Sequence, residues 1–143
     1  MRTVWRLVVA LDCLLILSAV VIVAAMGQAG DFDEGYARAW ARANSTGRPL
    51  YVLIGSETCG PCQRMKLTTI PAAKAAGSLD GVEVVVVDYA GDEAKAVREF
   101  FGLPAEHAVP VSCFAVRGAD RWRKWYVTGE LDQRSLTRFC GVP

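Results

Sequence analysis

Hydrophobic and polar positions alternate along this chain with two periods, one typical of helices and one typical of strands. Apolar residues recur at helical spacing over residues 32–43, and the pattern stops at the polar segment 44–47. A short apolar run at 50–54 predicts a strand. The nearly continuous β-branched run at 82–88 predicts a strand buried on both faces, and such a strand needs a parallel neighbour.

The rest of the chain continues this alternation. Helices are expected at 62–67, 92–101 and 133–140, and two hairpin strands at 111–116 and 122–127. The first of these helices must end or kink before Pro71, and residues 71–76 predict a second short helical piece. Gly102 closes the next helix, and Asp132 caps the last one. The order predicts one α/β domain over residues 31–143.

The first thirty residues have a different pattern, an almost unbroken apolar run over residues 7–26. Roughly 20 such residues can span a bilayer. Arginines precede the run and carboxylates follow it, so the positive-inside tendency keeps the N-terminus in the cytoplasm and exports the rest. We therefore expect residues 1–30 to be a signal-anchor or transmembrane segment. It would anchor the domain to the inner membrane of a bacterial cell envelope, facing the periplasm.

A second interpretation of this segment stays open. Asp12 interrupts the apolar run, and a carboxylate at mid-membrane costs on the order of 2.5–3.5 kcal/mol. Residues 13–26 alone have the length of a signal-peptide core, and the small residues at 27–29 offer a cleavage site. An uncleaved anchor is favoured because the full run exceeds the usual signal-peptide length. The alternative is a protein secreted after cleavage near Ala29.

The charge balance excludes one class of partner. The 143 residues carry 16 Lys and Arg against 15 Asp and Glu, which gives a formal net charge of +1. A chain so balanced has no general electrostatic attraction for nucleic acid or for acidic substrates. Nucleic-acid binding is therefore not expected.

The candidate chemistry lies in Cys59-Gly60-Pro61-Cys62, between the strand at 50–54 and the next helix. A short turn from strand to helix places the first sulfur at the helix N-terminus, where unpaired N–H groups and the macrodipole favour a thiolate. Cys59 is thus the expected nucleophile, and Cys62 the thiol that resolves a mixed disulfide formed at Cys59. Pro61 suits the first helical turn, and Gly60 lets a substrate chain approach the sulfur closely.

The alternative is that these two thiols are half of a metal site, or an inert pair. A structural zinc site takes four ligands, commonly as two such pairs, and the sequence has no second pair. The remaining candidate ligands form no recognisable spacing: Cys13, Cys113, Cys140 and the single histidine, His107. Redox chemistry is the preferred interpretation, with no metal and no cofactor expected.

The order of elements resembles the thioredoxin superfamily over roughly residues 31–143. The tetrapeptide at 59–62 is identical to the thioredoxin motif, and Asp88 ends the second strand much as in thioredoxins. Val109-Pro110 matches the position of the family's cis-proline. The resemblance implies a central mixed sheet flanked by helices, with Pro110 in cis against the cysteine pair. The substrate-binding residues expected from it are Gly60, Pro61, Val109 and Pro110.

Three positions depart from that family. Thr58 stands where thioredoxins usually carry Trp before the first cysteine. Leu53 and Val84 stand where thioredoxins have a buried Asp and a Lys that manage the proton of the resolving thiol. Proton transfer at Cys62 must then rely on water or on another group, for which Glu57 is the candidate. The departures predict slower catalysis than in a thioredoxin, or a shifted pH dependence.

The sequence therefore predicts a thiol–disulfide oxidoreductase that acts on proteins outside the cytoplasmic membrane. Segments 47–50 and 69–71 resemble exported thioredoxin-like domains more than cytosolic thioredoxins. Because Gly60-Pro61 resembles the reducing members, we expect a reductase or isomerase with protein thiol and disulfide substrates and an upstream electron donor or acceptor. Two alternatives stay open: a metal or iron–sulfur module built on the two thiols, or an anchored adaptor without cysteine chemistry.

Three features outside the motif have simple explanations. Cys113 and Cys140 are expected to be buried bystander thiols, with a bridge between them as the alternative. His107 is expected to be a solvated loop histidine, with an active-site role as the alternative. A hairpin edge guarded by cations is predicted by three aromatic residues interleaved with three basic ones, with a partner-binding face as the alternative: Trp122, Trp125 and Tyr126 with Arg121, Arg123 and Lys124.

Overall fold

The computed structural model describes residues 35–141. The expected anchor or signal segment at 1–30, with its apolar run at 7–26, lies outside these residues. No helix within residues 35–141 has the length and apolar character needed to cross a membrane.

The described residues follow the predicted α/β order. The elements are α2 (Tyr36–Thr46), β1 (Leu50–Gly55), α3 (Gly60–Arg64), the π-helical segment η1 (Met65–Thr69), α4 (Ile70–Ala75), β2 (Glu83–Asp88), α5 (Asp92–Phe101), β3 (Val111–Arg117), β4 (Trp122–Thr128) and α6 (Gln133–Cys140). Helices α5 and α6 have the predicted bounds. Gly102 follows α5 in the left-handed conformation, and Asp132 caps α6 by accepting a bond from the Ser135 N–H (2.7 Å).

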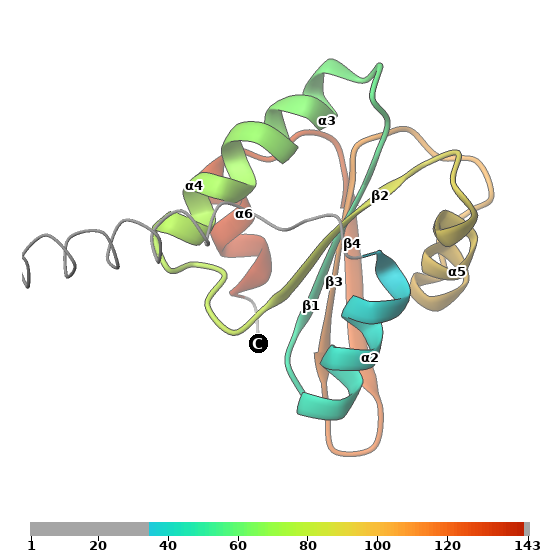
Figure 1. Ribbon diagram of the computed structural model, residues 1–143, viewed down its shortest axis with the longest axis vertical. Helices are drawn as coiled ribbons and strands as arrows, with labels where there is room; N and C mark the ends of the chain where they lie inside the picture. Colours follow the sequence, from blue (N-terminus) through green and yellow to red (C-terminus); the bar gives the residue numbers. More distant parts are fainter. Residues whose placement is uncertain (1–34, 142–143) are drawn as a thin grey trace, which may run out of the picture. The chain divides into compact units, whose positions relative to one another are not determined.

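The four strands form one mixed sheet in the order β2-β1-β3-β4. β1 pairs with β2 in parallel and with β3 antiparallel, and β3 and β4 form the predicted hairpin. Figure 1 shows α3, α4 and α6 on one side of the sheet and α2 and α5 on the other. The predicted central mixed sheet flanked by helices is confirmed.

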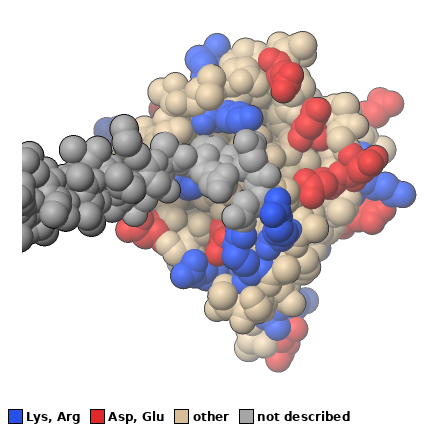
Figure 2. Space-filling view, viewed as in Figure 1, with Lys and Arg blue, Asp and Glu red and all other residues tan. Residues whose placement is uncertain are grey.

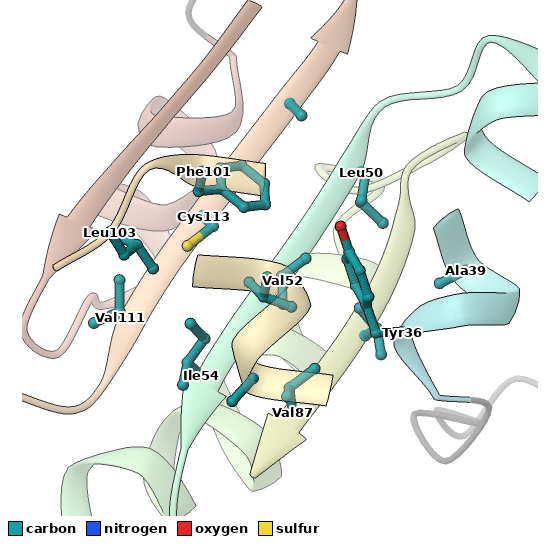
Figure 3. Packing of buried hydrophobic residues seen from close by; sticks show 14 of the residues in the cluster. Tyr36, Ala39, Leu50, Val52, Ile54, Val87, Phe101, Leu103, Val111 and Cys113 are labelled. Carbon is teal, nitrogen blue, oxygen red and sulfur yellow. The ribbon is translucent and has the colours of Figure 1, made fainter. Parts of the chain in front are cut away.

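Alternation along the strands divides the core into two clusters. In β1, Leu50, Val52 and Ile54 belong to the cluster under α2 and α5, and Tyr51 and Leu53 to the cluster under α3, α4 and α6. All five are fully buried because β1 is a central strand. Figure 3 shows the first of these clusters from close by.

The prediction that the run at 82–88 is buried on both faces needs a correction. In β2 burial alternates: Val85 and Val87 are buried, whereas Val84 and Val86 are only half-buried and Asp88 is exposed. The parallel neighbour predicted for this strand is present, as β1. β2 is, however, an edge strand, so one of its faces has less covering than a central strand would have.

The helix after the cysteines also differs from its prediction. It does not end before Pro71 but continues from Gly60 to Ala75. The irregularity expected there is the π-helical segment η1, after which α4 begins at Ile70. At its end the Ile70 N–H bonds to the Met65 carbonyl five residues back. The wider turn accommodates Pro71, which has no N–H and whose ring would crowd the preceding turn of a regular α-helix.

The two tryptophans of the hairpin point to opposite faces of the sheet. Trp122 packs against Trp40, with ring centroids 5.2 Å apart, and Trp125 packs against Phe114 (5.3 Å). They hold helices on both faces, which contradicts the idea that together they form one partner-binding face. Figure 2 shows basic and acidic side chains on the same visible face, so that face has no uniform charge.

Candidate active site

One end of the sheet brings together the residues around the cysteine pair. The β1–β2 register sets Gly55 beside Asp88, and the β1–β3 register sets Pro110, the residue before β3, beside Gly55. The Gly129 N–H then donates to the Pro110 carbonyl (2.8 Å). Asp88, Gly55, Pro110 and Gly129 thus form a row across the sheet, at the end where β1 leads into α3.

The cysteine pair lies just beyond this row. Cys59 and Cys62 form a disulfide with their Cα atoms 5.2 Å apart. Cys59 is the N-cap of α3, and its Sγ accepts a hydrogen bond from the Cys62 N–H (3.3 Å). Cys59 is partly exposed, whereas Cys62 is only 3% exposed. The geometry separates a partly exposed cysteine at a helix N-terminus from a buried cysteine one turn later.

Hydrogen bonds from Cys59 and from the helix after it stabilise the turn that precedes Cys59. The Ser56 carbonyl accepts bonds from the Cys59 N–H (3.2 Å) and from the side-chain amide of Gln63 (3.2 Å). The Ser56 and Thr58 hydroxyls lie 3.3 Å apart. These bonds fix the position of the nucleophile relative to both β1 and α3.

Gly55 allows the helix to approach the sheet at this point. A Cβ atom on Gly55 would lie 2.9 Å from Cys62 Cβ and 3.2 Å from Cys62 Sγ. Both distances are shorter than the separation of about 3.5–4.0 Å that carbon atoms in contact normally keep. Only glycine therefore lets Cys62 sit directly on the end of β1.

The Val109–Pro110 peptide bond is cis, as the resemblance implied. Val111 and Cys113 belong to the cluster under α2 and α5, so the alternation of β3 places Pro110 on the opposite face, with α3. The proline is buried and Val109 half-buried. Pro110 therefore shares both its end and its face of the sheet with the cysteine pair.

A second contact joins the cysteine helix to the turn after β4. Arg64 makes a bidentate ion pair with Glu130, at 2.8 and 2.7 Å. Next to it, the Leu131 N–H lies 3.4 Å from the sulfur of Met65. The ion pair is exposed, yet it fixes the α3–η1 junction relative to Gly129, the last member of the row.

A cavity of about 160 Å³ lies at Cys62, between the cysteine helix and the ends of β1 and β2. Its walls combine apolar and charged side chains: Leu53, Gly55, Ser56, Glu57, Cys62, Gln63, Lys66, Val86, Val87 and Asp88. Glu57 and Asp88 are exposed, and Lys66 is half-buried. Although Cys62 is almost excluded from solvent, its surroundings include one cation and two carboxylates.

The comparison with family models identifies residues 31–115 as thioredoxin-like. The chain belongs to the thioredoxin-like family. The match covers β1, the cysteine motif, β2 and most of β3, so it includes the row of residues at the cysteine pair except Gly129. No curated protein matches the chain in sequence.

Solved structures share the thioredoxin fold at low sequence identity. A thioredoxin from Thermus thermophilus is 22% identical, with a TM-score of 0.59 over 73% of this chain and 80% of that one. A disulphide isomerase from Xylella fastidiosa Temecula1 is 16% identical, with a TM-score of 0.55 over 78% of this chain and 90% of that one. At such identities these likenesses support the fold of the thioredoxin-like chain and nothing finer.

The positions at which this thioredoxin-like chain departs from thioredoxins can now be placed. Leu53 is fully buried in the core and also lines the cavity at Cys62. Val84 is half-buried and does not line that cavity. Glu57, the candidate for proton transfer, does line it. The apolar wall formed by Leu53 cannot accept a proton from Cys62.

His107 lies beside the row at the cysteine pair, because it packs against Tyr89, whose N–H donates to the Gly55 carbonyl (2.7 Å). His107 is half-buried, not solvated: its ring packs edge-on against Tyr89 with centroids 5.1 Å apart, and its Nε2 is buried without a hydrogen-bond partner among the described residues. Cys113 and Cys140 are unpaired. Figure 3 shows Cys113 in the cluster under α2 and α5, whereas Cys140 packs against the other cluster. The sheet separates them, so no bridge forms.

Several residues of the site were not identified from sequence. Gly55, Ser56 and Gln63 shape the turn, and Lys66 and Asp88 line the cavity. One signal was available for Lys66, because it follows Cys62 by four residues and such positions share a helix face. Within residues 35–141, no group of three or more His, Cys, Asp and Glu side chains is placed to hold a metal ion.

Proposed function

We propose that this protein is a thiol–disulfide oxidoreductase that acts on disulfides of other proteins as a reductase or isomerase. The observation that carries the proposal is the unequal pair: a partly exposed Cys59 at a helix N-terminus and a buried Cys62 one turn later. The helix N-terminus favours a thiolate at Cys59, which is the reactive form. Membership of the thioredoxin-like family supports the same chemistry.

In the proposed reaction the Cys59 thiolate attacks one sulfur of a substrate disulfide. A bond forms between Cys59 and that sulfur, and the other substrate sulfur leaves as a thiolate with the electron pair. The Cys62 thiolate then attacks Cys59 Sγ, which forms the Cys59–Cys62 disulfide and releases the first substrate sulfur as a thiolate. The substrate gains two electrons and the pair loses two, which a dithiol electron donor must return.

The substrate chain is proposed to dock along the end of the sheet that carries the cysteine pair. Val109 and Pro110 border it from β3, and Gly60 and Pro61 from the motif. Support comes from the shared face and end of the sheet described above. At Gly60 an added Cβ would approach only the tip of the Arg64 side chain (3.6 Å), so the motif offers little obstruction beside Cys59.

The reduction potential of the pair tests this proposal. The full-length protein is equilibrated in graded thiol–disulfide buffers, and its thiols are trapped and counted by mass. A reductase should lie near the thioredoxin value of about −270 mV and an isomerase near about −180 mV, whereas a value near −120 mV would make it a disulfide donor. Cys62→Ser should accumulate a mixed disulfide with a protein substrate, and Cys59→Ser should not. A pair that does not cycle at all would overturn the proposal.

Two alternatives give different results in the same preparations. A metal or iron–sulfur module predicts stoichiometric metal or a chromophore in the purified protein, lost in both cysteine variants. A non-catalytic adaptor predicts that Cys59→Ser leaves the cellular function intact. Clean two-electron cycling together with loss of function in Cys59→Ser contradicts both alternatives.

We also propose that the domain works outside the cytoplasmic membrane, anchored by residues 7–26. The support is the sequence pattern, an apolar run of membrane-spanning length with arginines before it and carboxylates after it. A membrane-impermeant maleimide, added to intact reduced cells, should label Cys59 of the wild-type chain, as shown by mass mapping of the labelled peptide, and the label at this position should be absent in Cys59→Ser. Labelling only after lysis would place the domain inside, and a shortened chain would favour cleavage near Ala29.

A further inference from the structure

Charged side chains line the cavity beside the buried Cys62. Cys62 must lose a proton before it can attack Cys59, because the thiolate is the nucleophile. Burial disfavours that charged form, and Cys62 is 3% exposed. The apolar walls at Leu53 and Val86 offer no compensation. Some polar group of the cavity has to stabilise the thiolate.

Lys66 is placed to provide this stabilisation. It follows Cys62 by four residues on the same helical run, and both residues line the cavity. Residues four apart share a helix face. An opposite charge near a titrating group favours its charged form, and the partly buried setting of Lys66 limits the screening of its charge by water.

We propose that Lys66 is the positioning residue of the resolving thiol: its ammonium group stabilises the Cys62 thiolate across the cavity, and Glu57 takes the proton. This inference rests on the proposed oxidoreductase function. Lys66 thus supplies, from the cysteine helix, the positive charge that thioredoxins carry on a strand at the position of Val84.

The other charged groups around Cys62 act in known directions. Glu57 and Asp88 line the cavity, and their negative charges oppose the thiolate. Asp88 accepts the Ala90 N–H through Oδ1 (3.2 Å), which ties it to the turn after β2. We assign proton transfer to Glu57, and Asp88→Asn, compared with Glu57→Gln in the same assay, tells the two carboxylates apart. Arg64, on the same helix, is paired with Glu130 outside the cavity.

The resolving step moves one proton and exchanges one disulfide bond for another. In the mixed disulfide the proton of the Cys62 thiol passes to the Glu57 carboxylate, through water in the cavity, which has room for several molecules. The thiolate attacks Cys59 Sγ, a bond forms between the two cysteine sulfurs, and the Cys59–substrate bond breaks. The substrate sulfur leaves as a thiolate with the electron pair, and Glu57 returns its proton to solvent.

The test uses an aromatic disulfide reagent that releases a coloured thiolate. After subtraction of the release from the double variant Cys59→Ser/Cys62→Ser, which reports Cys13, Cys113 and Cys140, the reduced full-length chain should release two equivalents in two phases. The first phase reports attack by Cys59, and the second reports the resolving attack by Cys62. Cys62→Ser should show only the first phase, which assigns the second. The rate of the second phase is measured against pH in the wild type, Lys66→Gln, Lys66→Arg and the control Lys95→Gln, an exposed lysine on α5 outside the cavity.

The expected signature is a shifted pH profile with an unchanged plateau. In Lys66→Gln the second phase should be slower by at least about threefold at pH 7 and should reach the wild-type rate at high pH, where the thiolate forms without help. Lys66→Arg should restore most of the rate, and Lys95→Gln should match the wild type. Glu57→Gln removes both the proton acceptor and a charge that opposes the thiolate. We expect loss of the acceptor to dominate, so the second phase should slow near neutral pH and keep its plateau.

A separate measurement distinguishes failure of this inference from failure of the proposed function. In Cys59→Ser, the pKa of Cys62 is read from the pH dependence of its alkylation, which needs no catalysis. Addition of Lys66→Gln should raise that pKa by about 0.5 or more. If two equivalents are released and Lys66→Gln behaves like Lys95→Gln in both assays, the inference is wrong and the function stands. A wild type that releases one equivalent overturns the function, and the alkylation result still decides the role of Lys66.

Discussion

Gly55→Ala is the sharpest single test of how the site is built. The added methyl group would lie 2.9 Å from Cys62 Cβ and 3.2 Å from its sulfur. Carbon atoms in contact prefer about 3.5–4.0 Å, so Cys62 would have to retreat by roughly 0.6–1.1 Å. Retreat is opposed on the helix side because Met65, one turn further on, is fully buried. Both Cβ atoms are bonded directly to the backbone, so rotation of a side chain cannot relieve this contact.

The expected cost follows from what overpacked sites show. An extra methylene in a well-packed core destabilises by about 1–3 kcal/mol, and the short distance here puts Gly55→Ala in that range. Gly60→Ala is the matched control. Its Cβ would meet only the end of the Arg64 side chain at 3.6 Å, and it stands at the first position of α3. There alanine should be neutral or stabilise by up to about 1 kcal/mol.

The assay is urea unfolding of the oxidised full-length protein and both variants, followed by tryptophan fluorescence. The midpoint should fall in Gly55→Ala and stay equal or rise in Gly60→Ala, with the slope unchanged in both. If Gly55→Ala unfolds within about 0.5 kcal/mol of the wild type, the helix does not rest on the end of β1 as described. The description of the cavity at Cys62 would then fail with it.

Three further predictions concern a buried thiol, a buried pair of hydroxyl groups and an exposed ion pair. Burial raises the pKa of Cys113 to about 12, so a thiol reagent at pH 8 should modify it only after unfolding; rapid labelling of folded protein, seen by mass spectrometry, would contradict this. The hydroxyl of Tyr51 bonds to Ser112 Oγ at 2.8 Å inside the core, so Tyr51→Phe should lose about 1–3 kcal/mol in urea unfolding, and adding Ser112→Ala should recover part of it. The hydrogen bonds and charge of Arg64 lower the pKa of Glu130, so its contribution to stability is present at neutral pH and is lost as the pH falls through the folded-state pKa. At low salt and neutral pH, Glu130→Gln should therefore lower Tm only slightly, and this difference from wild type should shrink on acidification. A difference that grows on acidification would contradict the prediction.

Most of the fold could be predicted because local signals and long-range packing agree in this chain. The apolar period, Gly102 and Asp132 define α5 and α6 without help from the rest of the structure. The helix at Pro71 is different, because its local signal favours an interruption. Packing of the fully buried Met65 and Ile70 against the same core cluster keeps the run continuous, and the π-helical turn resolves the conflict.

The site was predictable where a residue type carries the chemistry and not where geometry does. Two cysteines at this spacing are recognisable as a redox motif from sequence alone, and the resemblance to thioredoxins located the cis-proline at Pro110. Gly55 has no such signal, because nothing local shows that Cys62 will rest on it. The row across the sheet depends on strand register, and the register joins positions far apart in the sequence. For the same reason the sequence could not exclude a Cys113–Cys140 bridge, which depends on the faces the two residues occupy.

The departure at Leu53 has a physical consequence for both stability and catalysis. A carboxylate at this fully buried position would have to be paired or protonated, since an isolated buried charge costs several kcal/mol. Leucine removes that cost and adds apolar packing beneath the cysteine helix. The charges that remain near Cys62, on Lys66 and Glu57, reach solvent and so avoid most of the desolvation penalty. Partly exposed charges are also screened more by water and salt, so the resolving step should depend more on ionic strength than one served by a buried pair.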